Sequence, residues 1–311
     1  MSRTWLYVLF LSVVVGASGM AAAAPTGLDA ALALFSGGGD VMIPYSDEGR
    51  VELEAAIAAF RSAIGVPEGF DETDEGAYAS LPLESTKKDL VNKLSQSYYT
   101  LGDVFLRTGK EAETTYVKGK QWALASLRLN PAFVTLEKDK GFAAAVAEEG
   151  DSLALYWACG NWLRVAEFDK LGAVFAGAPA KCEAMAKRAL EIDGGYICYG
   201  PYRTLGAYFG GLPSLFGQDL GLALAFFCEV VSEPSFCAGC TSCPIDPSSS
   251  EYFENRLLFV EFYLMEKKLW PDAARVLLSI LDEPIGTKYP LYNAVCQEKA
   301  GTFLAEVEKH L

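Results

Sequence analysis

The chain has 311 residues, of which 51% are hydrophobic and 21% are charged, so it can bury a large core and is not globally disordered. Its 40 acidic residues outnumber its 26 basic residues and give a net charge of −14. This charge argues against nucleic acid and anionic membrane surfaces as partners, because both repel a strongly acidic protein.

The first 23 residues have the organisation of a secretory signal peptide. Arg3 supplies positive charge, Trp5–Val15 form an apolar stretch, and small residues follow. We expect export and cleavage after Ala22 or Ala23. An uncleaved anchor is the alternative, although the apolar stretch is short for a membrane span. No cysteine lies near this junction, so the lipobox of a lipoprotein is absent.

The rest of the chain, residues 24–311, is predicted to form a single helical-repeat domain. Apolar residues recur with helical spacing nearly throughout, and no stretch shows a convincing strand pattern. The third to tenth predicted helices pair into four hairpins. The predicted helices are Leu28–Phe35, Val51–Ile64, Leu83–Thr108, Ala112–Leu129, Ser152–Phe168, Lys181–Ile192, Tyr199–Leu212, Leu220–Val231, Tyr252–Leu269, Ala273–Leu281 and Tyr292–His310.

Similar endings close the second helix of each hairpin: SLRLNP, RALEID, EVVSEP and SILDEP. The steps between them are 63, 40 and 50 residues, measured at Pro131, Gly194, Pro234 and Pro284. The pattern predicts an all-α fold of degenerate tetratricopeptide-like hairpin repeats, an α-solenoid with a continuous core and a concave face. A non-repeating helical bundle is the alternative.

An acidic stretch, Gly69–Gly76, separates the second predicted helix from the first hairpin. It does not form a calcium loop, because Pro82 occupies the place of the bidentate glutamate. We interpret it as a solvated loop.

All eight cysteines follow the leader, and an even number in an exported chain favours disulfides. We predict disulfides among Cys228, Cys237, Cys240 and Cys243. Three cysteines at this spacing also suit a metal or iron–sulfur centre, which is the alternative. A ferredoxin-type run would need a fourth cysteine soon after Cys243, and the next is Cys296. We therefore expect no metal.

No catalytic constellation is evident in the sequence. The one histidine, His310, is the second-to-last residue, and chain ends usually fray. There is no nucleophile elbow and no phosphate-binding loop. We interpret Ser85-Thr86-Lys87-Lys88, a chance match to a catalytic Ser-x-x-Lys pattern, as a helix cap. The sequence thus predicts a binding or scaffold protein without enzymatic activity or cofactor.

Aromatic and cationic residues gather on two predicted helices and are the candidate ligand-binding residues. Pro201 places Arg203 in a first helical turn, where the helix dipole disfavours a cation and a carboxylate partner is expected. That carboxylate belongs either to a ligand or to the protein. We expect Arg203 and Trp162 to lie on the wall of one cleft. The full candidate set is Tyr156, Trp162, Arg164, Tyr202, Arg203 and Tyr208.

Two stretches of this region, LALYWACGNWLRVAEF and AMAKRALEIDGGYICYGPYRTLGAYFGGLPSLFGQDLGLALAFF, carry a family resemblance. The most specific part runs from Gly200-Pro201-Tyr202-Arg203 through Leu205-Gly206 to the bend Leu212-Pro213. Over roughly residues 83–234 the chain resembles the T-component proteins of TRAP transporters. The aromatic residue before Arg203 is often His in that family and is Tyr202 here.

The resemblance implies an all-helical, tetratricopeptide-like fold in the periplasm and a cleft for a small apolar or amphipathic ligand. It also implies a periplasmic solute-binding protein as partner, and homotrimers. Two features depart from the family, the missing lipobox cysteine and the cluster Cys237–Cys243. Our hypothesis is an accessory protein of TRAP-type solute transport that binds a hydrophobic carboxylate or a solute-binding partner. A pure interaction scaffold is the alternative, and a metal- or redox-active exported protein is a third hypothesis.

Overall fold

The computed structural model describes residues 27–37, 39–237 and 244–311. Within these residues every regular element is helical, apart from one isolated bridge between Gly37 and Asp40. The predicted all-α class is confirmed. The predicted signal peptide, Cys240 and Cys243 lie outside the described residues.

Fourteen α-helices are described, together with two π-helical segments and several short 3-10 turns. The π-helical segments are Leu101–Leu106, which continues α3, and Val260–Met265, which continues α12. The α-helices are α1 (Leu28–Ala33), α2 (Asp47–Ile64), α3 (Lys88–Thr100), α4 (Gly109–Arg128), α5 (Pro131–Lys140), α6 (Phe142–Glu148), α7 (Ser152–Phe168), α8 (Lys170–Phe175), α9 (Ala178–Asp193), α10 (Tyr196–Gly211), α11 (Leu220–Cys228), α12 (Phe253–Phe259), α13 (Trp270–Asp282) and α14 (Pro290–Val307).

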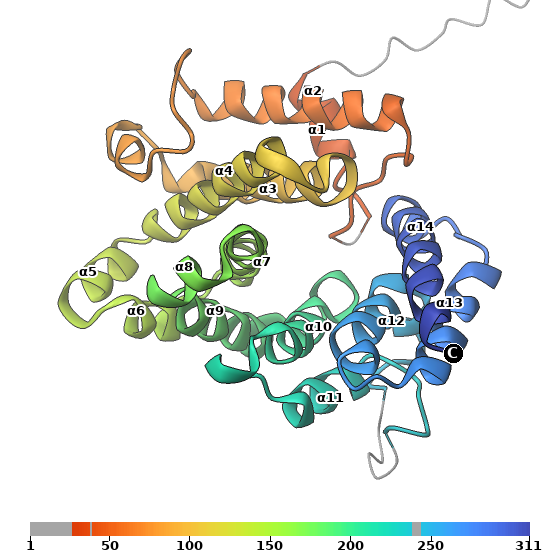
Figure 1. The fold of residues 1–311 in the computed structure, drawn as a ribbon. Helices are drawn as coiled ribbons and strands as arrows, with labels where there is room; N and C mark the ends of the chain where they lie inside the picture. Colours follow the sequence, from red (N-terminus) through yellow and green to blue (C-terminus); the bar gives the residue numbers. More distant parts are fainter. Residues whose placement is uncertain (1–26, 38, 238–243) are drawn as a thin grey trace, which may run out of the picture.

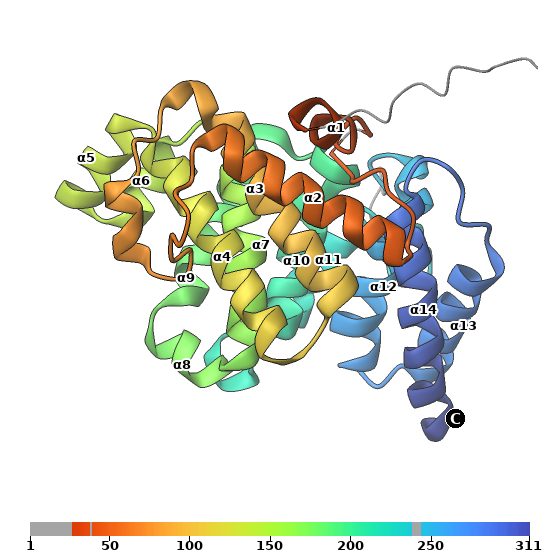
Figure 2. The same ribbon diagram turned by 90° about the horizontal axis from the view of Figure 1, so that it is seen from above.

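The four predicted hairpins correspond to α3 with α4, α7 with α9, α10 with α11, and α12 with α13, and each pair is in contact. Successive hairpins also touch, through α4 and α7, α9 and α10, and α10 and α12. The chain winds from α1 and α2 past α5 and α6, along α9 to α11, and then to α12 to α14 (Figure 1). Seen from above, α14 lies next to one end of α2 (Figure 2), and the Tyr45 hydroxyl just before α2 donates to Glu298 of α14 at 2.7 Å.

Capping side chains fix where several helices begin. Asp151 accepts a hydrogen bond from the backbone N–H of Ala154 at the start of α7. Asp219 does the same for Gly221 and Leu222 at the start of α11. Such caps satisfy backbone donors that the first helical turn leaves free.

Short helices fill the connections that the sequence left as loops. The 63-residue step between the first two hairpin endings contains α5, α6 and α8. Asn130 caps α5 ahead of Pro131, and Asp169 caps α8. These helices have 10, 7 and 6 residues, too few for a helical period to stand out.

The two π-helical segments occupy matching places, since each ends the first helix of a hairpin. Each is followed within a few residues by a non-glycine residue with a positive φ angle, Arg107 at 60° and Lys268 at 57°. A π-helical turn inserts one extra residue, so side chains beyond it leave the register of the preceding helix. Asp103 lies on the first segment and Glu261 on the second.

The interpretation of the acidic stretch Gly69–Gly76 as a solvated loop is wrong for Glu72. The side chain of this residue is buried, with only 4% of its surface exposed. Its carboxylate accepts hydrogen bonds from the Tyr98 hydroxyl at 2.9 Å and from Trp122 Nε1 at 2.5 Å. Arg61 Nε lies 3.3 Å from the same carboxylate. Glu72 thus anchors this loop in the core through contacts with three side chains.

A disulfide joins Cys228 at the end of α11 to Cys237 in the following loop. It confirms the predicted cross-link for two of the four candidate cysteines. Cys159, Cys182, Cys198 and Cys296 carry free thiols. Among the helices that the structure describes, none combines the length and the apolar character needed to cross a membrane.

Candidate functional site

Two neighbouring cavities lie among the hairpins. One has a volume of about 250 Å³ and lies among the π-helical segments, α7 and α14. The other has a volume of about 400 Å³ and lies among α7, α8, α10 and the start of α9. Glu167 and Glu261 line both, so the two cavities are adjacent, and we call them together the cleft.

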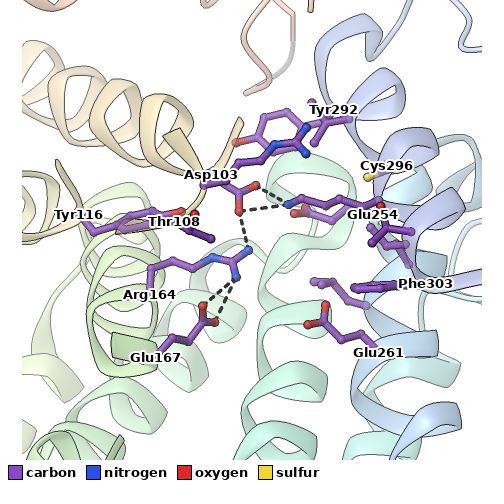
Figure 3. A pocket seen from close by; sticks show the side chains of 16 residues that line it. Asp103, Thr108, Tyr116, Arg164, Glu167, Glu254, Glu261, Tyr292, Cys296 and Phe303 are labelled. Carbon is purple, nitrogen blue, oxygen red and sulfur yellow. Dashed lines mark hydrogen bonds and ion pairs between the residues drawn. The ribbon is translucent and has the colours of Figure 1, made fainter. Parts of the chain in front are cut away.

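The smaller cavity is the charged end of the cleft (Figure 3). Asp103 accepts from Arg164 Nη2 at 2.7 Å and from Lys299 Nζ at 3.3 Å. Arg164 also holds Glu167, at 3.1 Å. Burial by itself would raise the pKa of Asp103, but the attraction of Arg164 and Lys299 is stronger, and the pKa lies below its ordinary value. Asp103 therefore remains ionised and joins three elements.

A buried ion pair lies behind the charged end. Arg203 Nε is 2.8 Å from Oε2 of Glu254, and Glu254 lines the cavity. Arg203 Nη2 donates to the Tyr156 hydroxyl at 3.2 Å, and the guanidinium lies 4.6 Å from the ring centre of Tyr252. The carboxylate expected beside Arg203 thus belongs to the protein, which resolves the alternative left open by the sequence.

Arg203 also stabilises an unusual turn at the start of α10. Ile197, Cys198 and Tyr199 have φ values of 42°, 49° and 65°, the left-handed region. This conformation costs roughly 1–2 kcal/mol per residue with a β-carbon. Arg203 Nη1 donates to the Ile197 carbonyl at 2.6 Å, and Asn255 Nδ2 donates to the Cys198 carbonyl at 3.2 Å. These bonds offset part of the strain.

Glu261 lies where the two ends of the cleft meet. Close packing of α10 brings its segment there, since a β-carbon on Gly210 would lie 2.1 Å from the Phe262 carbonyl oxygen. Within residues 27–37, 39–237 and 244–311, Glu261 has no hydrogen-bond or ion-pair partner for its carboxyl group. Burial raises the pKa of this group above its ordinary value.

The larger cavity is the apolar end of the cleft. Its wall is mostly aliphatic and aromatic, with Leu163, Val174, Leu212 and Phe262 among its residues. Tyr208 also lines it, and its hydroxyl donates to Glu183 at 3.3 Å. The cleft therefore offers apolar surface at one end and ionised groups at the other.

The structure places the six candidate residues in three settings. Arg164 lines the charged end and Tyr208 the apolar end. Tyr156 and Arg203 are buried together behind Glu254.

Trp162 and Tyr202 lie elsewhere. The Trp162 ring packs on Phe142, with the ammonium groups of Lys120 and Lys181 at 5.2 and 5.1 Å from its centre. Tyr202 is half-buried, with its ring 6.4 Å from that of Tyr199. Trp162 and Arg203 have different neighbours and neither lines the cleft, so the structure does not bring them to a common wall.

Sequence reasoning missed Asp103, Glu254, Glu261 and Lys299. Three of them look like ordinary charges on a helix face, and their partners lie far away in the chain. Glu261 had a usable signal, because it is a single carboxylate in the apolar run VEFYLM. A charge in such a run faces either a partner or a cavity.

Comparison with known families agrees with the resemblance seen in the sequence. The family model described as TRAP transporter T-component matches residues 78–233, half of the chain. A comparison with curated proteins gives no match. The matched segment supplies Asp103, Arg164 and Glu167 to the cleft, and it includes Arg203 and Tyr208. The chain belongs to the TRAP transporter T-component family.

Proposed function

We propose that this protein is an exported accessory component of TRAP-type solute transport and that it binds a small amphipathic molecule in the cleft. Family membership supports the link to transport. The leader-like first 23 residues support export to the periplasm. The observation that carries the ligand proposal is that a charged and an apolar cavity lie side by side and share Glu167 and Glu261 in their walls.

The apolar end supplies most of the binding free energy in this proposal. Transfer of each methylene from water to an apolar site contributes about 0.8 kcal/mol. The charged end fixes the orientation, because ionised groups desolvated in a cavity discriminate strongly between head groups.

A ligand carboxylate has less support than the sequence indicated. The two arginines expected to receive it are already engaged by protein carboxylates, Arg164 by Asp103 and Arg203 by Glu254. A carboxylate ligand would have to compete with these partners.

A protein partner remains the second candidate, as a scaffold or alongside the ligand. The exposed side chains of Phe175 and Leu215 favour it, at 83% and 90% exposure. Each lies within two residues of a cleft-lining residue, Val174 and Pro213 respectively. A periplasmic solute-binding protein, or further copies in a homotrimer, would cover such side chains.

Native mass spectrometry of the protein purified from its own host tests the ligand proposal. We expect a small molecule to co-purify with the wild type and to be lost from Ala207→Trp, which fills the apolar end. Ala132→Trp, at an exposed position of α5, is the matched control and should keep the molecule. An empty wild-type protein that also binds no added amphipathic compound would overturn the proposal.

A further inference from the structure

Glu261 differs from every other charged side chain that lines the charged end of the cleft. Asp103, Arg164 and Lys299 form one ion-paired group, and Arg164 also holds Glu167. The remaining two pair with residues outside the cavity: Glu254 with Arg203, and Arg107 with Glu298. Among the residues that the structure describes, Glu261 alone in this set has no hydrogen-bond or ion-pair partner for its carboxyl group.

The nearby cations attract Glu261 without contacting it: Arg164 and Lys299 lower its pKa, but they form their ion pairs with other carboxylates. Arg164 contacts two carboxylates and Lys299 contacts Asp103. Burial raises the pKa of Glu261, and the like charges of Glu167 and Asp103 add to this effect. A carboxyl group held in a cavity under these conditions gains free energy from a donor that enters from outside the protein.

The backbone fixes where this carboxyl group lies. Glu261 is on the π-helical segment Val260–Met265, and that segment packs against Gly210 and Gly211 of α10. The next residue, Phe262, forms part of the apolar wall. Glu261 lines the charged cavity (Figure 3) and also the apolar one, so it is at the point where an apolar tail would end and its head group would begin.

We propose that the ligand of this cleft carries an amino group at the end of an apolar chain, and that Glu261 accepts the hydrogen bond of that ammonium. This inference rests on the proposed ligand-binding function and adds the head-group class. An ammonium–carboxylate bond is about twice as strong as a bond between neutral groups. A ligand carboxylate in the same place would face Glu261 and Glu167 and be repelled.

Lys170 is the residue that would favour the opposite charge. It lines the apolar end and forms no ion pair with any described residue. Its side chain is exposed, however, so water screens its charge and the gain from pairing is small. Lys170→Gln is therefore a useful companion variant, and we expect it to leave head-group preference unchanged.

Three probes with the same tail separate the head-group classes: octylamine, octanol and octanoate. Calorimetric titration in neutral buffer, where the amine is protonated, measures each affinity for the wild type and for Glu261→Gln. Glu308→Gln removes the same charge from an exposed position of the last turn and is the matched control. Octanol affinity reports on whether the cleft is intact in each variant.

We expect wild-type protein to bind octylamine about tenfold more tightly than octanol, the factor for one charge-assisted bond, and octanoate most weakly. The octylamine preference should disappear in Glu261→Gln and persist in Glu308→Gln. Tightest binding of octanoate, or an octylamine preference that survives Glu261→Gln, would overturn the inference. Equal binding of all three probes would also overturn it while leaving the proposed function standing, and failure of all three to bind would remove both.

Discussion

The Arg203 guanidinium and the Glu254 carboxylate form an ion pair, 2.8 Å from Nε to Oε2, across the contact of α10 with α12. Both side chains are nearly inaccessible to solvent, with relative exposures of 3% and 9%. Glu254 reaches the cleft and Arg203 does not. The arginine of the family-specific segment therefore positions a carboxylate of the cleft and does not line the cleft itself.

Replacing Arg203 should destabilise the fold strongly. Arg203→Ala leaves Glu254 buried without its partner and removes the donor to the Ile197 carbonyl. Breaking one side of a buried pair costs about 3–5 kcal/mol in the free energy of unfolding, which urea titration measures. Lys288→Ala breaks the exposed pair with Glu251 and should cost less than about 1 kcal/mol. An Arg203→Ala protein of near-wild-type stability would contradict this account.

Glu72 should matter to stability more than its place in an acidic loop indicates. Glu72→Ala leaves the donors of Tyr98 and Trp122 without an acceptor in the core. We expect a loss of about 2–4 kcal/mol in the free energy of unfolding. Glu68→Ala, at an exposed position of the preceding turn, should change it by less than about 0.5 kcal/mol. If the two variants lost similarly little free energy of unfolding, the side chain of Glu72 would be solvated like that of Glu68.

Asp40 should make stability depend on pH. Burial raises the pKa of this carboxyl group from 3.8 to about 7, and the N–H of Val41, which donates at 2.8 Å, lowers it only in part. Between these two values the folded state holds a proton that the unfolded state releases. Stability is therefore full below pH 3.8 and falls as the pH rises to about 7, by up to about 1.4 kcal/mol per pH unit.

Asp40→Asn cannot ionise, so this variant should lose that slope. Urea midpoints for wild type and variant, taken at a series of pH values across the window, provide the measurement. We expect the urea midpoint of the wild type to fall relative to that of the variant as the pH rises. Parallel curves would show that Asp40 has an ordinary pKa in the folded protein.

The bond between Cys228 and Cys237 closes a short loop, with a sequence separation of 9. Chain-entropy arguments assign about 2–3 kcal/mol to a loop of this size. The free energy of unfolding of the exported protein should therefore be lower by that amount in Cys228→Ser than in the wild type. Peptide mass mapping should recover a Cys228–Cys237 peptide. Mapping that finds Cys237 joined instead to Cys240 or Cys243 would refute the pairing.

The hairpins could be predicted from the sequence because most of their helices have 13 residues or more and regular apolar spacing. Ser152–Phe168 begins and ends as expected for α7, since Asp151 caps it and its apolar spacing is regular. The need of Arg203 for a carboxylate was also evident, because Pro201 fixes the start of the right-handed part of α10. These features depend on residues within one or two turns of each other.

The partners across the fold could not be predicted in the same way. Glu254 follows Arg203 by 51 positions, and Lys299 follows Asp103 by 196. Nothing local marks these pairs. The orientation of Glu261 depends on a π-helical turn whose extra residue leaves no mark on apolar spacing. Glu72 looked solvated in the sequence because it lies in a stretch of acidic residues, and its neighbours Asp71 and Thr73 are indeed exposed.

The walls of the cleft come from different parts of the chain. Asp103, Arg164 and Glu167 belong to the segment that defines the family, which ends at residue 233. Glu254, Glu261 and Lys299 all follow it. The second wall can therefore change in evolution while the matched segment stays the same. Under the proposed function, two proteins of this family can share that segment and still differ in the head group that they accept.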